Sequence, residues 1–164
     1  MIESFTAKMI SEIDGDTFWA KTSSNEKICI RLASVDCPDK GQEFRQEALE
    51  ALRGMIFGKV IQVDSLGIDN PLYERTLAFI HVGDKDVNAE LLKQGLAWHA
   101  TEHSDSEVLA KLESDARKSK TGLWSEPDPV EPWKWRPEQK EEIQEENELN
   151  WTCLIPRDTI RLTG

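Results

Sequence analysis

Alternating apolar and polar residues run through the first part of the chain. Such alternation is typical of half-buried strands, because successive side chains of a strand point to opposite faces. Asp14-Gly15, a turn signal, follows the first alternating stretch. In the third stretch Arg31 lies on the opposite face from Ile30 and Leu32. The pattern predicts three strands, over residues 4–13, 16–22 and 27–35.

Apolar residues then recur at helical spacing. Gly58 and Gly95 follow two of these stretches and are typical helix ends, while Ser104 or Asp105 can cap the third at its start. Three helices are therefore predicted, over residues 43–57, 87–94 and 105–120.

Two further strand patterns lie between the first and second predicted helices, at residues 59–65 and 74–82. A polar loop containing Asp69-Asn70-Pro71 separates them. Five short strands with helices inserted late in the chain favour an α+β fold. The arrangement is compatible with a small Greek-key barrel of the oligonucleotide-binding (OB) type.

The composition changes after residue 125. Four prolines and two tryptophans fall within residues 126–137, and a run rich in Glu and Gln follows to residue 148. That run suits a solvated helix or disorder, and residues 149–164 can add one strand. We therefore predict one domain over residues 1–125 and an extension over residues 126–164 that packs on the domain or trails from it.

Composition excludes several classes of protein. The 164 residues are 38% hydrophobic and 31% charged, which fits a globular chain with a polar surface. No apolar run approaches the ~18 residues of a membrane span, so no membrane partner is expected. The first residues lack the features of a signal peptide. The compartment stays open, since an exported protein can have lost its signal.

The cysteines and the net charge argue against further classes of protein. Cys29, Cys37 and Cys153 are odd in number and form no CxxC pair, which argues against a disulfide scaffold and a structural zinc site. Cys29 lies in an apolar strand pattern and is expected to be a buried thiol. The formal net charge of −11 argues against a protein that coats nucleic acid, because phosphate binding favours basic surfaces. An enzyme needs only a local positive site.

Candidate chemistry concentrates in two motifs, Ile13-Asp14-Gly15-Asp16-Thr17 and the run from Arg31 to Asp39. Taken alone, the first is most simply a turn and Arg31 a surface charge. Together they place carboxylates beside an arginine, and a second arginine follows in Tyr73-Glu74-Arg75. Carboxylates hold divalent cations and guanidinium groups bind phosphate in a paired fashion. The combination favours phosphodiester chemistry.

The same motifs carry a resemblance to a known family. Over roughly residues 5–125 the chain resembles the staphylococcal nuclease (thermonuclease) family, whose fold is an OB-like five-stranded barrel with three helices. Besides the two motifs above, the resemblance rests on Tyr73-Glu74-Arg75-Thr76-Leu77-Ala78, Val87-Asn88, Leu92-Lys93-Gln94-Gly95-Leu96-Ala97, and Ala116-Arg117-Lys118 with Gly122-Leu123-Trp124. The segment Pro132-Trp133-Lys134-Trp135-Arg136 is similar to a C-terminal extension of some bacterial members.

The resemblance implies a calcium-dependent nuclease that acts on single-stranded DNA or RNA, and we expect a monomer. Calcium takes several oxygen ligands in loose geometry, which leaves places for water and phosphate. By position, the resemblance implies calcium ligation by Asp16, Asp36 and the backbone carbonyl of Cys37, phosphate binding by Arg31 and Arg75, general-base chemistry by Asp39, and substrate contact by Tyr73.

Three departures from the family motivate an alternative. Asp39 stands where the family has glutamate, although Glu43 lies nearby, and Leu72 stands where the staphylococcal protein has a phosphate-binding lysine. The family's second nucleotide-stacking tyrosine has no counterpart, so Trp98 or His99 are candidates to stack instead. The alternative is a catalytically weak or inactive OB-fold module that binds nucleic acid or protein. A third possibility is an interaction protein that uses the Pro/Trp-rich extension.

Overall fold

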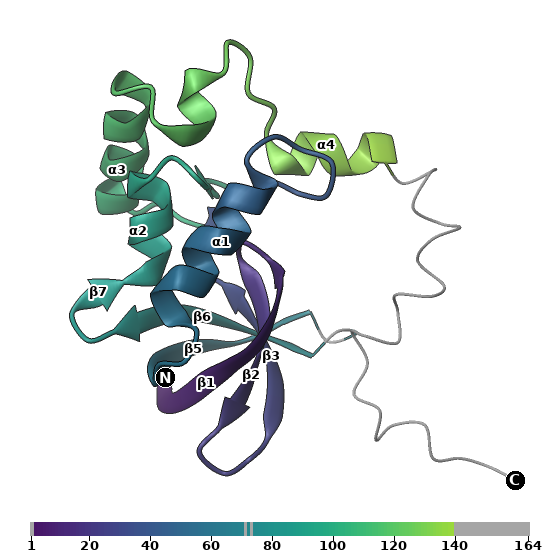
Figure 1. Cartoon of the computed structure of the whole chain (residues 1–164), viewed down its shortest axis with the longest axis vertical. Helices are drawn as coiled ribbons and strands as arrows, with labels where there is room; N and C mark the ends of the chain where they lie inside the picture. Colours follow the sequence, from purple (N-terminus) through teal and green to yellow (C-terminus); the bar gives the residue numbers. More distant parts are fainter. Residues whose placement is uncertain (1, 71, 73, 140–164) are drawn as a thin grey trace, which may run out of the picture.

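Five strands close into a barrel in the computed structural model, which describes residues 2–70, 72 and 74–139 (Figure 1). They hydrogen-bond in the order β3-β2-β1-β5-β6, and β3 also pairs in parallel with β6, which closes the sheet. A two-stranded ribbon continues from β6 into β7 (Lys85–Asp86). The predicted α+β fold with a five-stranded barrel is confirmed. The barrel strands are β1 (Glu3–Asp14), β2 (Thr17–Thr22), β3 (Lys27–Leu32), β5 (Ile61–Asn70) and β6 (Arg75–Val82).

Four α-helices occur within the described residues; α1 and α2 contact each other and the barrel, and α3 packs on α2 (Figure 1). The three predicted helices are confirmed to within two residues at each end. The predicted cap of the third was wrong, because Ser106 rather than Ser104 or Asp105 accepts from the Leu109 N–H, at 3.3 Å. The helices are α1 (Arg45–Ile56), α2 (Val87–Lys93), α3 (Glu107–Lys118) and the unpredicted α4 (Pro132–Gln139), and a short 3-10 helix, η1, spans Gly122–Ser125.

The predicted strand over residues 27–35 was wrong at its end. β3 stops at Leu32, and Ser34 has φ = 65°, a left-handed conformation that turns the chain. The next residues form a separate strand, β4 (Val35–Asp36), which pairs with β8 (Trp98–His99). Alternation alone did not reveal this turn. Its consequence is that Asp36 lies beside Arg31 and not one strand length away from it.

The strand predicted over residues 59–65 is also longer than expected. β5 begins at Ile61 and runs to Asn70, with register shifts at Gly67 and near its end. Residues that were expected in a loop therefore form a strand pair with β6. This pairing places Asp69 next to Arg75.

The turn between β1 and β2 packs directly against α1. A Cβ atom on Gly15 would lie 2.6 Å from Cβ of Ala48 and 3.1 Å from the side chain of Cys37, so only glycine allows this approach. The close contact fixes the position of Asp16, the second residue of the turn. The core around it is apolar, and its largest fully buried side chains include Phe18, Ile30, Leu32, Leu52, Ile80 and Leu91.

Asn88 is a polar residue of this core and is fully buried. Its Nδ2 donates to the carbonyl oxygens of Ala33 at 2.9 Å and Ala78 at 3.2 Å, and its Oδ1 accepts from the Ile80 N–H at 3.1 Å. These bonds tie the turn after β3 to β6. Sequence reasoning noted Asn88 only as part of a motif and assigned it no role.

Tryptophan packing joins α4 to the rest of the molecule. Trp98 makes edge-on contacts with Trp124, at 4.5 Å between ring centroids, and with Trp133, at 5.9 Å. Arg117 stacks over Trp124 at 3.9 Å. Trp124 and Trp133 therefore act as packing anchors between the extension and the domain.

The extension is described only as far as residue 139. The strand predicted within residues 149–164, most of the Glu-rich run and Cys153 lie outside the described residues. None of the described helices combines the length and the apolar character that crossing a bilayer requires.

Candidate active site

All five of the side chains predicted to bind metal or phosphate or to act as base line one cleft of about 660 Å³. They come from separate parts of the chain: the β1–β2 turn, β3, β4, the loop after β4 and the first residue of β6. The barrel closure between β3 and β6 brings the two arginines to the same cleft. The residues that converge are Asp16, Arg31, Asp36, Asp39 and Arg75.

Asp16, Asp36 and Arg31 form the buried half of the cleft. The two aspartates are only 4% and 5% exposed. Arg31 Nη2 lies 3.4 Å from Asp16 Oδ2 and 3.3 Å from Asp36 Oδ1. Its Nη1 donates to the carbonyl oxygens of Leu32 at 2.6 Å and Val35 at 2.9 Å. One guanidinium therefore holds both carboxylates and the tight turn between β3 and β4.

Cys37 contacts the buried half of the cleft through its backbone N–H. Its N–H donates to Asp16 Oδ2 at 2.7 Å, and its side chain is 1% exposed. Burial raises the pKa of the Cys37 thiol well above its usual value, which favours the neutral thiol. Calcium ligation by its carbonyl stays a prediction.

Burial and crowding of carboxylates perturb the acids of the cleft. Burial, followed by the charge of Asp16, raises the pKa of Asp36 to about 6. The same two causes raise the pKa of Asp14 to about 6, although Arg45 pairs with it at 3.1 Å. Arg31 shows the complementary effect: burial disfavours its charge, but Asp16 and Asp36 raise its pKa above the usual value. A shared cation relieves such crowding.

Asp39 and Arg75 form a more exposed half. Arg75 is the first residue of β6 and pairs with Asp69; the two side chains are 29% and 28% exposed. Asp39 lies in the loop after β4, where its backbone N–H donates to Gln42 Oε1 at 2.8 Å. Burial raises the pKa of the Asp39 carboxyl, and a neighbouring arginine opposes this effect.

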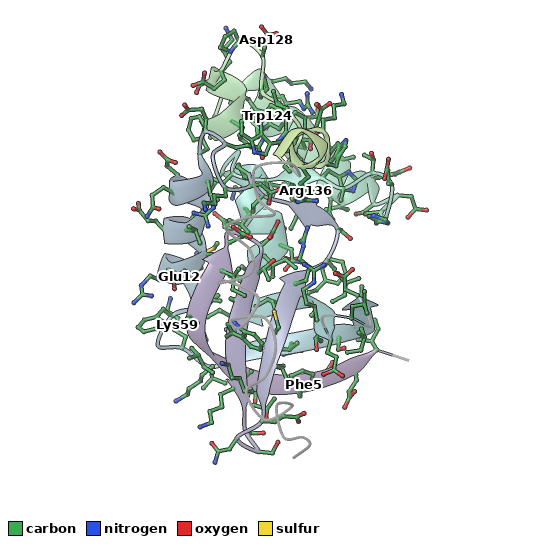
Figure 2. The ribbon with its side chains drawn as sticks, turned by 90° about the vertical axis from the view of Figure 1, so that its right-hand side faces the viewer. Phe5, Glu12, Lys59, Trp124, Asp128 and Arg136 are labelled. Atoms are coloured by element: carbon green, nitrogen blue, oxygen red, sulfur yellow. The ribbon has the colours of Figure 1, made fainter. Side chains whose placement is uncertain are left out.

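That neighbour is Arg136 of α4, which sequence reasoning missed. Its Nη2 donates to Asp36 Oδ1 at 2.7 Å and its Nε donates to Asp39. In Figure 2 Arg136 extends from α4 toward the barrel. The only signal in the sequence was the Pro/Trp-rich segment around it, which predicts packing and says nothing about a contact across 100 residues of chain.

Several remaining sequence predictions concern substrate contacts. Tyr73 lies outside the described residues, so its role stays a prediction. Leu72 is 86% exposed. The alternative that Trp98 or His99 stacks on a nucleotide was wrong, because both are buried, at 5% and 4% exposure.

The cleft has donors that fit a hard divalent cation. Among the described residues, no three His, Cys, Asp or Glu side chains form a metal-binding cluster. Asp16 and Asp36 nevertheless converge on one guanidinium nitrogen, and a cationic nitrogen of Arg136 sits against Asp36. Five aspartates and three arginines line the cleft, an excess of two negative charges. Two carboxylates with further oxygen from backbone, water or phosphate suit calcium better than zinc.

Comparison with known proteins agrees with this geometry. Residues 29–126 match the family model described as "Staphylococcal nuclease homologue". An uncharacterized endonuclease of Haemophilus influenzae is 33% identical over 138 residues, covering 84% of this chain and 76% of that protein. Protein ParB of Escherichia coli is 38% identical over 143 residues, covering 80% and 78%. A micrococcal nuclease of Shigella flexneri is 31% identical over 144 residues, covering 80% of each. These matches support nuclease activity, and the chain belongs to the staphylococcal nuclease family.

Proposed function

We propose that this protein is a calcium-dependent nuclease that hydrolyses phosphodiester bonds of DNA or RNA, with single-stranded chains as its substrate. The observation that carries the proposal is the convergence of two paired carboxylates, two arginines and a third carboxylate on one cleft. A single-stranded chain can enter a cleft in which part of the lining is exposed. The calcium site would use Asp16 and Asp36.

Both arginines bind the scissile phosphate in this proposal, from different parts of the fold. Arg31 Nη1 donates to two carbonyl oxygens and Nη2 pairs with Asp16 and Asp36, so Nη2 would become available to the phosphate when a bound cation takes over the two carboxylates. Arg75 is more exposed and approaches from β6. Paired N–H donors on the non-bridging oxygens stabilise the charge that builds there in the transition state. A lysine at either position lacks this paired geometry.

Asp39 is the candidate general base. It accepts a proton from a water molecule, whose oxygen then bonds to phosphorus. The bond from phosphorus to the leaving sugar oxygen breaks, and that oxygen takes up a proton from solvent water. Proton transfer of this kind contributes about 10²- to 10⁴-fold in rate. A calcium ion held by Asp16 and Asp36 would supply charge neutralisation and orientation of the water and the phosphate.

The test is cleavage of a fluorescently labelled single-stranded oligonucleotide, as DNA and as RNA, from about pH 7 to about pH 10. We expect cleavage in millimolar calcium, loss of cleavage in excess chelator, and restoration when calcium is returned. Magnesium in place of calcium measures the preference for the larger ion with its looser coordination. Absence of cleavage under all of these conditions would overturn the proposal.

The matched control is Arg75→Ala, because Arg75 lies at the edge of the cleft and its removal leaves the buried pairs intact. Cleavage that persists unchanged in Arg75→Ala would point to a contaminating nuclease or to another site. Binding of the oligonucleotide without turnover would instead support the alternative of a nucleic-acid-binding module.

A further inference from the structure

We propose that α4 belongs to the active site, and that Arg136 is a positioning residue which fixes Asp39 relative to Asp36 and competes with a divalent cation for Asp36. This inference rests on the proposed function for the roles of the two aspartates. Arg136 lies outside residues 29–126, the part of the chain that matches the family model. It therefore adds a component to the cleft that the family match does not describe.

The contact geometry is specific. Two different nitrogens of one planar guanidinium reach two carboxylates: Nη2 donates to Asp36 at 2.7 Å and Nε donates to Asp39. Asp36 is held on a strand, whereas Asp39 lies in a loop. Because the guanidinium is planar and rigid, its bonds to both carboxylates fix the position of Asp39 relative to Asp36. Errors of about 1 Å in the position of a catalytic group can reduce rates about 100-fold.

The helix that carries Arg136 is itself attached to the loop that carries Asp39. Trp135 Nε1 donates to the carbonyl oxygen of Lys40 at 3.1 Å. Gln42 accepts from the Asp39 N–H and donates to the carbonyl oxygen of Val130 at 2.9 Å. Together with the packing of Trp133 on Trp98, these contacts hold α4 over the loop.

The charge of Arg136 has a second consequence. It contributes one of the three positive charges that face five aspartates in the cleft. A cation bound to Asp36 would lie within a few ångströms of this guanidinium and be repelled by it. Removal of Arg136 should therefore tighten binding of a divalent cation by about tenfold or more, while it weakens catalysis.

A higher calcium affinity together with a lower kcat distinguishes a positioning role from a structural one, because damage to the fold would weaken both calcium binding and catalysis. The experiment uses the full chain as wild type, Arg136→Ala, Arg136→Lys and Lys134→Ala. Calcium affinity is measured by calorimetry without substrate, and kcat and KM by oligonucleotide cleavage. Lys134→Ala is the matched control, because it removes the same charge from the same helix where Lys134 pairs with Glu131.

In Arg136→Ala we expect tighter calcium binding and a kcat reduced by about 10- to 100-fold. Arg136→Lys keeps the charge but cannot bridge two carboxylates in the same way, so its calcium affinity should stay near wild type while kcat falls. Lys134→Ala should match wild type in both measurements.

Equal calcium affinities in wild type and Arg136→Ala, or absence of calcium binding in both, would overturn the inference. So would weaker calcium binding in Arg136→Ala, or an unchanged kcat in an active wild-type protein. If the wild type binds calcium but cleaves nothing, the proposed function fails. The calcium comparison then still decides whether Arg136 competes for the site.

Discussion

The two halves of the cleft are built in different ways. The buried half, Asp16, Asp36 and Arg31, stands on or next to barrel strands, and each of these side chains has partners within the fold. The exposed half contains Asp39 on a loop and Arg75 at the start of β6, and we include Arg136 of α4, which contacts Asp39. Its side chains are 23%, 29% and 45% exposed.

This difference in burial and contacts indicates which residues stabilise the fold in addition to their predicted role in the reaction. Arg31 neutralises two buried carboxylates and satisfies two carbonyl oxygens, so the barrel depends on it. Arg75 makes a pair at the edge of the cleft, where solvent weakens its contribution to stability. Both arginines are predicted to bind the same phosphate. Stability measurements should therefore separate two residues that activity measurements do not.

The largest effect is expected from Arg31→Ala compared with Arg75→Ala. Arg31→Ala leaves two buried carboxylates without their central partner and should lower the free energy of unfolding by about 3–5 kcal/mol. Arg75→Ala should lower it by less than about 1 kcal/mol. Cleavage should fall by at least about 100-fold in both, because each loses a donor to the transition state. Urea unfolding and cleavage assays at saturating calcium check the two properties.

Equal losses of stability in the two variants would break the distinction between the halves. Arg45→Ala serves as a control for the loss of a partly buried arginine near the cleft. Arg45 pairs with Asp14 at 3.1 Å and donates to the Ile13 carbonyl, whereas Asp16 and Asp36 pair with Arg31. Its effect on stability should lie between those of the other two.

Asn88→Ala tests how far the buried half depends on the core behind it. The substitution leaves the Ile80 N–H and the Ala33 carbonyl without their side-chain partner inside the protein. Unsatisfied buried groups cost about 1–3 kcal/mol each, so a loss of about 3 kcal/mol is expected in urea unfolding. Gln62→Ala, which removes an exposed amide, should cost less than about 0.5 kcal/mol. A similar small loss in Asn88→Ala would show that the turn after β3 is held by other contacts.

Asp39→Ala tests the exposed half by its effect on rate alone. Loss of a general base should lower kcat by about 100-fold with little change in the free energy of unfolding. Asp39→Glu, which lengthens the side chain, should retain more activity than Asp39→Ala. Glu43→Ala is the comparison that identifies the base. If it lowers kcat more than Asp39→Ala does, Glu43 and not Asp39 performs the proton transfer.

Much of the buried half could be predicted from the sequence, because strand alternation and turn residues are local signals. The hairpin at Asp14-Gly15 and the strand that carries Arg31 follow from them. The turn at Ser34 did not, because a non-glycine residue with positive φ leaves no mark in the alternation. The resemblance to the family implied that Arg31 and Asp36 belong to one site, and the turn explains how the fold brings them within 3.3 Å of each other.

The exposed half was harder to predict for a physical reason. Arg136 reaches Asp39 from 97 residues away, and this contact depends on how α4 docks. Docking in turn depends on edge-on packing of tryptophans whose partners the sequence does not identify. Asp69 was missed in the same way, because its position follows from the unexpected length of β5.

The smallest effect is expected from Trp133→Ala, which tests whether the docking of α4 matters for the reaction. Trp133 is partly buried and contacts Trp98 edge-on at 5.9 Å between centroids, so its loss should cost about 1 kcal/mol. Trp133 packs against a small cluster that is separate from the main core of the barrel, so urea unfolding should show no more than this loss of about 1 kcal/mol. If α4 positions Arg136, however, looser docking should lower kcat by about 3- to 10-fold, less than Arg136→Ala does. Trp133→Phe keeps an aromatic ring against Trp98 and should retain most of the activity. An unchanged kcat in Trp133→Ala would mean that the hydrogen bonds of Trp135 and Gln42 hold α4 by themselves, whereas a loss larger than that of Arg136→Ala would place further residues of the extension in the cleft.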